Sequence, residues 1–195
     1  LFPKNKIIKK TITFIQNYNE YKIKKKGDGV YIYMGISSHK KRVVYGFEMI
    51  KLIILSNKHL KFYICTNNYD YTKFLNSSED NNNILDFLNR KNIIFNSYNK
   101  KDLINIYSKC FIGLRLTNND GNANTIQELG LMGIRCIHID NIFPNVITYK
   151  KNNKIWDIKI DNDERIKICK KYVNGINLLI MNEKKEIGKV NYKIR

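Results

Sequence analysis

The stretch CFIGLRLTNNDGNANTIQELGLMGIRCIHI, from Cys110 to Ile139, determines which fold the chain can adopt. It begins with an apolar run from Phe111 to Leu116 that has the composition of a buried strand. A loop rich in Asn, Asp and Gly follows, then a short helical pattern, and a second strand pattern covers Arg135 to Ile139. The stretch therefore predicts a strand, a loop, a helix and a strand in succession.

The helix within this stretch has recognisable ends. Asn124 and Gln127 stand three residues apart, as in a capping box, so the helix should begin at Thr125, and Gly133 should end it. A helix that begins beyond the carboxyl end of a parallel strand directs free backbone N–H groups into the crevice where open α/β sheets bind ligands. A phosphate or a sugar would fit there, and an ordinary crossover without a ligand is the alternative.

The same stretch resembles a known signature. Its matching positions are Asp120, Gly121, Asn124, Glu128 and Gly133. An acidic residue and a glutamate eight positions later, ahead of a helix and a strand, resemble the C-terminal, donor-binding domain of GT-B glycosyltransferases, especially family 4. The resemblance implies that Glu128 holds the ribose hydroxyls of a sugar nucleotide donor. It also implies that Asp120, Gly121, Asn124 and Thr125 meet the diphosphate and the sugar, although the family usually has Glu where this chain has Asp120.

A second loop earlier in the chain has the features of an anion site. Gly35 directly follows an apolar strand pattern, and a basic loop containing Lys40 and Lys41 then leads into a helical pattern. In the resembling family this loop usually carries Arg after the Gly and Lys several residues later, and the two cations grip the donor diphosphate. Lys41 stands at the expected distance from Gly35, so the resemblance implies a catalytic role for it. Ile36 occupies the Arg position.

Arg115 lies near the end of an apolar strand, where a charged side chain must reach solvent or meet an anion. Strand alternation places it on the face of Phe111 and Gly113. Its planar fork matches phosphate oxygens, so it is a catalytic candidate that could replace the missing cation of the earlier loop. A structural salt bridge with Asp120 or Glu128 is the alternative, and the sequence leaves both open.

Strand and helix patterns alternate along the chain. Strands are expected at Val30 to Met34, Lys61 to Thr66, Ile93 to Phe95, Phe111 to Leu116, Arg135 to Ile139 and Ile147 to Tyr149, and a long helix from Asp161. This order predicts an α/β fold, a doubly wound, Rossmann-like parallel sheet with helices on both faces, which the resemblance identifies as the C-terminal half of a GT-B fold. We expect a basic connector at 1–28, a nucleotide-sugar-binding domain at 29–182 and a basic tail at 183–195.

Charge and cysteine content narrow the choice of partners. The 195 residues include 35 Lys and Arg against 17 Asp and Glu, a formal net charge of +18, which raises nucleic acid as a partner. The excess lies in flanks such as 22–26 and 184–193 rather than around the motifs, so solvated lysines explain it better. The four cysteines are far apart and lie in or beside apolar runs: Cys65, Cys110, Cys136 and Cys169. They indicate buried free thiols in a reducing compartment, and therefore a cytoplasmic protein that could lie at a membrane surface.

The sequence as a whole favours a glycosyltransferase that moves a sugar from a nucleotide diphosphate sugar to an acceptor, with retention, as the resemblance implies. The acceptor, a glycan, a lipid or a protein, would be bound by an N-terminal domain. No metal ion or other cofactor is expected, because the scattered histidines and cysteines lack metal-ligand spacing and the protein supplies its own cations. A non-enzymatic nucleotide-binding or basic nucleic-acid-binding module is the alternative.

Overall fold

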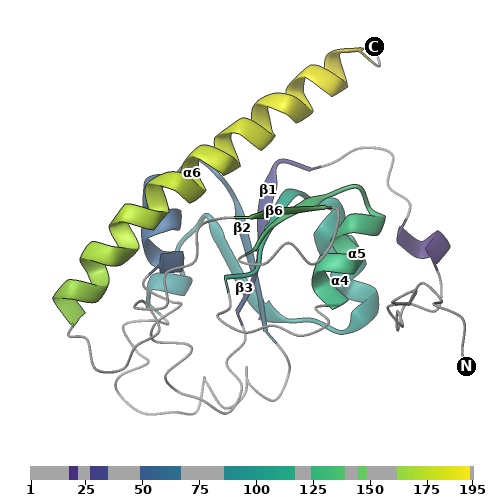
Figure 1. The fold of residues 1–195 in the computed structure, drawn as a ribbon. Coiled ribbons are helices and arrows are strands. Elements are labelled where there is room, and N and C mark those ends of the chain that lie inside the picture. Colours follow the sequence, from purple (N-terminus) through teal and green to yellow (C-terminus); the bar gives the residue numbers. More distant parts are fainter. Residues whose placement is uncertain are drawn as a thin grey trace, which may run out of the picture.

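The chain folds around a single parallel sheet of six strands in the order β3-β2-β1-β4-β5-β6 (Figure 1). The computed structural model describes residues 18–21, 27–34, 49–66, 86–116, 124–138, 145–148 and 162–193. The strands are β1 (Gly29–Tyr33), β2 (Phe62–Thr66), β3 (Ile93–Ser97), β4 (Cys110–Leu114), β5 (Arg135–His138) and β6 (Val146–Thr148). Each differs from its predicted range by at most a few residues, and every described pair is parallel.

Helices cover both faces of this sheet. The labelled helices are η1 (Tyr18–Tyr21), α4 (Lys100–Ser108), α5 (Asn124–Leu131) and α6 (Asn162–Lys193), and residues 49–56 and 86–88 are also helical. The helix at 49–56 and α6 pack on one face, while η1, α4 and α5 pack on the other (Figure 1). We call these the α6 face and the α5 face. The predicted doubly wound fold is therefore confirmed.

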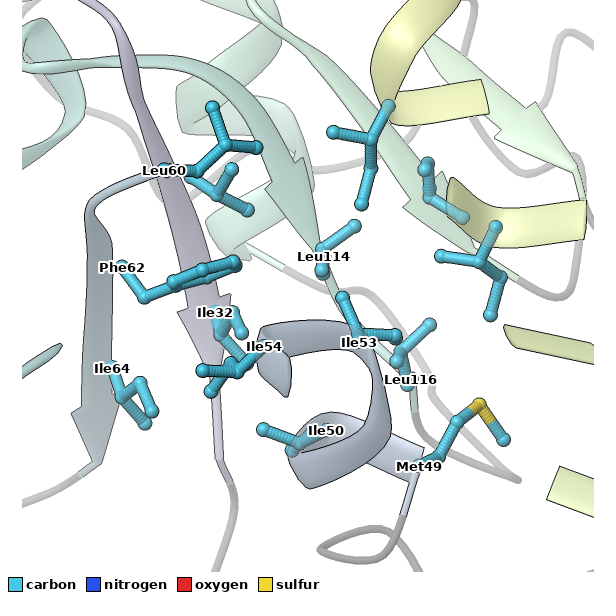
Figure 2. Packing of buried hydrophobic residues seen from close by; sticks show 14 of the residues in the cluster. Ile32, Met49, Ile50, Ile53, Ile54, Leu60, Phe62, Ile64, Leu114 and Leu116 are labelled. Carbon is cyan, nitrogen blue, oxygen red and sulfur yellow. The ribbon is translucent and has the colours of Figure 1, made fainter. Parts of the chain in front are cut away.

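The strands are apolar on both sides because both sides are covered. Along β1, Val30 and Ile32 belong to the cluster on the α6 face, whereas Tyr31 between them belongs to the cluster on the α5 face. Figure 2 shows Ile32 and Phe62 directed toward the helix at 49–56, where Ile54 meets them. The two-residue alternation of a strand thus builds two different cores on one sheet.

A β-bulge changes which residues of β4 share a face. Over one step of β1, the register partner on β4 advances by two residues, from Cys110 to Ile112. Phe111 consequently packs in the same cluster as Ile112, on the α6 face. Gly113 faces α5, and so does the side chain of Arg115. The sequence prediction that Arg115 shares a face with Phe111 is therefore wrong, because simple alternation does not anticipate the extra residue of a bulge.

Glycines bring α5 close to the sheet and end it. A methyl group on Gly113 would overlap with Leu129 of α5, so the absence of a side chain lets the helix lie directly on β4. The helix then ends at Gly133, whose φ of 69° is in the left-handed region. Ile134 N–H donates to Leu129 O at 2.8 Å and Gly133 N–H to Gly130 O at 2.9 Å, which is the Schellman arrangement. The prediction that Gly133 ends the helix is confirmed.

Both flanks of the expected domain contain helical residues. Tyr21 of η1, within the expected connector, is buried in the cluster on the α5 face. At the other end, α6 continues to Lys193 through the expected tail. Glu183, the first residue of that tail, is buried and its carboxylate lies 3.0 Å from the guanidinium of Arg135. The four cysteines are buried and form no disulfide bond, as predicted. Within the described ranges, no helix has the length and apolar character needed to cross a bilayer.

Candidate functional site

The sheet order places a topological switch point between β1 and β4. From β1 the chain proceeds outward to β2 and β3, and from β4 it proceeds the opposite way to β5 and β6. In open α/β sheets, ligands bind in the crevice outside the carboxyl ends of the strands at such a point. The side chains that end these two strands are therefore the first candidates for ligand contacts.

Arg115 follows β4 at this edge and is held from two sides. Its guanidinium carbon lies 4.2 Å from the centroid of the Tyr33 ring, at the end of β1. Its Nη1 donates a hydrogen bond to Thr125 Oγ1 of α5 at 3.3 Å. Cation–π contact and the hydrogen bond fix the plane of the guanidinium, which remains half-buried. A permanent cation is thus oriented between β1, β4 and the start of α5.

His138, the last residue of β5, supports the backbone of Arg115. Its Nδ1 lies 2.8 Å from the carbonyl oxygen of Arg115, and since a carbonyl can only accept, Nδ1 carries the proton. The ring is fully buried, and its Nε2 has no hydrogen-bond partner among the residues that the structure describes.

The first turn of α5 lies at the same edge of the sheet. The helix begins at Asn124, one residue before the predicted start, with Asn124 exposed and Thr125 half-buried. The first N–H groups of a helix have no partner within the helix, and the helix dipole adds positive potential there. Together with the Arg115 guanidinium, this helix start makes the edge favourable for a phosphate group.

Glu128 lies one turn further along α5 and is mostly buried, with 7% of its surface exposed. Its Oε2 accepts a hydrogen bond of 2.8 Å from the hydroxyl of Tyr107, on α4. The ring of Tyr107 in turn meets the ring of Tyr31 edge to face, with centroids 4.9 Å apart. Tyr21 approaches the same carboxylate from η1. Tyrosines of two different elements, α4 and η1, therefore lie beside the carboxylate.

These tyrosines remain protonated at neutral pH. Burial raises the pKa of Tyr107 well above its usual value, and the charge of Glu128 raises it further. Burial also raises the pKa of Tyr31, with Tyr107 contributing. The pKa of Tyr21 rises to about 12, first through burial and then through the charge of Glu128. Tyr107 and Tyr21 can therefore act as hydrogen-bond donors toward the Glu128 carboxylate.

Of the residues selected from the sequence, the structure describes Arg115, Asn124, Thr125 and Glu128. It brings Arg115 and Thr125 together, and places Glu128 deeper, against Tyr107. The others lie outside the described residues: Gly35, Lys40, Lys41, Asp120 and Gly121. No group of three His, Cys, Asp or Glu side chains that could hold a metal ion occurs in the described part of the chain.

Sequence reasoning missed three tyrosines. Tyr33 lies near the end of the predicted strand Val30 to Met34, two residues before Gly35 and the basic loop, and this position at a carboxyl edge was the available signal. Tyr107 lies among apolar residues in the sequence, and its hydroxyl in that apolar segment was the signal for a polar partner. Tyr21 lies in the segment assigned to a connector, and nothing in its neighbourhood indicated burial.

Comparison with solved structures bears on the fold. A chain in the crystal structure of the GtfA/B complex matches with a TM-score of 0.54 and 15% identity, covering 89% of this chain and 33% of its own length. The pneumococcal O-GlcNAc transferase GtfA, in complex with UDP and GlcNAc, matches with a TM-score of 0.48 and 13% identity. The match covers 87% of this chain and 36% of that one. The C-terminal domain of a group 1 family glycosyl transferase, LpcC from Francisella tularensis, matches with a TM-score of 0.43 and 15% identity. The match covers 77% of this chain and 85% of that one.

The match to the GtfA/B complex confirms the predicted fold, that of a GT-B C-terminal domain. This chain spans about a third of the matched chain. A scan against family models finds no match. A search among curated proteins finds no similar sequence either.

Proposed function

We propose that this chain is the donor-binding domain of a family 4-like glycosyltransferase, which transfers a sugar from a nucleotide diphosphate sugar to an acceptor with retention. The observation that carries the proposal is the placement of Arg115. A cation that cannot be neutralised stands at the switch point of the sheet, oriented by Tyr33 and Thr125 beside the start of α5. The diphosphate of a sugar nucleotide has the charge and geometry that this arrangement fits.

In such a transfer, negative charge grows on the departing diphosphate. Arg115 can donate two parallel hydrogen bonds to phosphate oxygens, and the N–H groups at Asn124 and Thr125 add oriented dipoles. Lys41, with Lys40 beside it, supplies further positive charge from the loop after β1, by the resemblance described above. Because side chains and backbone groups provide this charge, we expect catalysis without a bound metal ion or other cofactor.

The nucleoside part of the donor occupies the region next to Glu128. By the same resemblance, its carboxylate accepts hydrogen bonds from the ribose hydroxyls, while Asp120 and Gly121 lie near the sugar. Glu128 lies one helical turn after the start of α5. The proposed ribose contact is therefore separate from the proposed diphosphate contact. This separation matches a ligand with a charged middle and a hydroxylated end.

The acceptor requires a second wall of the cleft. Since the chain spans about a third of the GtfA/B chain that it matches, we propose that an N-terminal domain binds the acceptor, which is a glycan, a lipid or a protein. The match of fold is compatible with a cytoplasmic protein or one peripheral to a membrane. We propose the cytoplasm because the four buried cysteines form no disulfide bond.

The test is donor binding and donor hydrolysis by the full-length protein. We expect isothermal titration calorimetry to detect at least one of UDP, GDP and ADP, and chromatography to detect slow release of that diphosphate from its glucose or N-acetylglucosamine ester. Arg115→Lys should reduce both signals. Absence of binding to all three diphosphates, together with tight, steeply salt-dependent binding of labelled DNA or RNA at physiological salt, would instead establish the nucleic-acid alternative.

A further inference from the structure

Both peptide groups of Arg115 are held by β5. On the amino side, the N–H group of Arg115 donates to Ile137 O at 3.1 Å. On the carboxyl side, the carbonyl oxygen of Arg115 lies 2.8 Å from Nδ1 of His138, so a side chain holds the backbone just beyond the end of β4. Because peptide groups are planar, the two hydrogen bonds together set the direction in which the Arg115 side chain leaves the strand.

This direction matters because Arg115 extends to a different face from its neighbours. Leu114 and Leu116 are both buried in the cluster on the α6 face. Between them, Arg115 reaches the α5 face, where its guanidinium lies over the ring of Tyr33 and donates to Thr125. A long side chain amplifies any rotation at its base. A small rotation of the peptide plane after Arg115 would therefore move the guanidinium away from both partners.

His138 is poorly suited to a purely stabilising role. Its ring is fully buried, and Nδ1 carries the proton that the Arg115 carbonyl accepts. Nε2 is then an acceptor, and the described part of the chain offers it no partner. A buried polar atom without a partner lowers stability, and an apolar side chain would avoid that loss. What the histidine supplies, and an apolar residue cannot, is the N–H group that holds Arg115.

We propose that His138 is a positioning residue for the diphosphate site, because its Nδ1–H group holds the Arg115 carbonyl and thereby keeps the guanidinium over Tyr33 beside the start of α5. This inference rests on the proposed function, in which Arg115 binds the donor diphosphate. His138 itself touches no ligand, since its ring is fully buried. It acts through preorganisation, because a guanidinium that is already held in place loses less freedom when a phosphate binds.

Asparagine and leucine at position 138 form a matched pair of variants. The amide nitrogen of asparagine stands at the same place along the side chain as Nδ1, so His138→Asn keeps an N–H donor for the Arg115 carbonyl. Leucine has nearly the shape of asparagine but no donor. Both variants leave the space of the outer ring empty, so both should lower the melting temperature. Only His138→Leu should release Arg115. Ile137→Val, in the same strand, is the control for a loss of packing that leaves both backbone contacts in place.

The first measurement uses the full-length protein without a ligand. Protons above the face of an aromatic ring are shifted upfield in NMR spectra, and the guanidinium carbon of Arg115 lies 4.2 Å from the centroid of the Tyr33 ring. With isotope-labelled arginine, and the signal assigned by its loss in Arg115→Lys, the Nε–H proton should be shifted upfield in the wild type, His138→Asn and Ile137→Val. The shift should be reduced in His138→Leu. An unchanged shift in His138→Leu, or an equal reduction in His138→Asn, would overturn the inference.

The second measurement is the ratio of affinities for a nucleoside diphosphate and its free nucleoside, by calorimetry with UDP, GDP and ADP. His138→Leu should reduce this ratio by about threefold to tenfold, the effect of losing one neutral hydrogen bond. His138→Asn should stay within about twofold of the wild type. A ratio that tracks the melting temperature instead of the N–H donor would show that His138 is structural. A wild type that binds no diphosphate would refute the proposed function, and the NMR comparison alone would then decide whether His138 positions Arg115.

Discussion

The two faces of the sheet differ in chemistry although they share the same six strands. The cluster on the α6 face is built from Ile, Leu, Val, Phe and Met side chains, with a single cysteine. The cluster on the α5 face contains four buried tyrosines and three cysteines, and Glu128 lies against it. The cluster on the α6 face is almost entirely apolar, whereas the cluster on the α5 face also contains side chains that can form hydrogen bonds. Aliphatic packing and polar aromatic side chains are therefore divided between opposite sides of one sheet.

The largest loss of stability should follow a substitution in the core of the α6 face. Ile176 of α6 is fully buried, and Ile176→Ala should lower the free energy of unfolding by about 2–5 kcal/mol, because it removes buried methyl groups and leaves a cavity. Urea denaturation measures this loss. Ligand affinity of the folded protein should not change. Leu178, two residues further along α6, is 62% exposed, so Leu178→Ala should stay within about 0.5 kcal/mol of the wild type. Similar losses for both variants would contradict the packing described here.

A smaller loss of stability, on the α5 face, should be accompanied by a loss of ligand affinity. A methyl group at Gly113 would overlap with Leu129, so Gly113→Ala should cost about 1–3 kcal/mol of stability by pushing α5 away from β4. Because α5 carries Thr125 and Glu128, the same shift should weaken binding of nucleoside diphosphates. Denaturation and calorimetry on one preparation measure both quantities.

Gly175 provides the matched control for that variant. A methyl group at Gly175, in the interior of α6, would meet no atom within 4 Å. Gly175→Ala should therefore stabilise the protein by about 0.5–1 kcal/mol and leave affinity unchanged. Adding Leu129→Ala to Gly113→Ala should restore part of the affinity if overlap with Leu129 is the cause. An unchanged affinity in Gly113→Ala would show that the position of α5 is not coupled to the ligand site.

Much of the fold could be predicted because its signals are local. The strand at 62–66, the helix cap at Gly133 and the alternation of strands and helices each depend on residues close together in sequence. The sequence predicts a long helix from Asp161 without an end, and α6 continues to Lys193 through lysines and glutamates, which both favour helix. The bulge in β4 was missed because no residue type marks it.

The site was less predictable because its contacts join distant parts of the chain. The sequence named Arg115 and Glu128, but it could not show that Tyr33 of β1 stacks on the first or that Tyr107 of α4 binds the second. Both contacts depend on strand order and on the faces that helices present, and neither is visible in spacing.

Arg115 itself can be tested against an arginine at another place in the fold. Arg115→Lys keeps the charge and loses the planar fork, so it should weaken binding of nucleoside diphosphates by about 1–2 kcal/mol and leave binding of the free nucleoside nearly unchanged. Arg135 pairs with Glu183 of α6 and is half-exposed, so Arg135→Lys should leave both affinities intact. A lower melting temperature with unchanged affinity in Arg115→Lys would indicate a structural salt bridge.

The smallest expected effect is a difference between the two faces in how the free energy of unfolding depends on alkaline pH. The pKa of Tyr21 rises to about 12 in the folded protein, through burial first and the charge of Glu128 second, against about 10 for an unfolded tyrosine. The folded state therefore holds this proton more tightly than the unfolded state. Its contribution to stability is fully present below pH 10 and is lost as pH rises from about 10 to 12.

Tyr21→Phe should show a shallower loss of stability than the wild type over this range, measured by urea denaturation at successive pH values. Ile176→Val removes a methyl group on the α6 face and no ionising group, so it should lower stability by a similar amount at every pH and keep the wild-type slope. If Tyr21→Phe keeps that slope as well, the phenol of Tyr21 does not face Glu128 in the buried cluster, and the contrast between the two faces loses its electrostatic part.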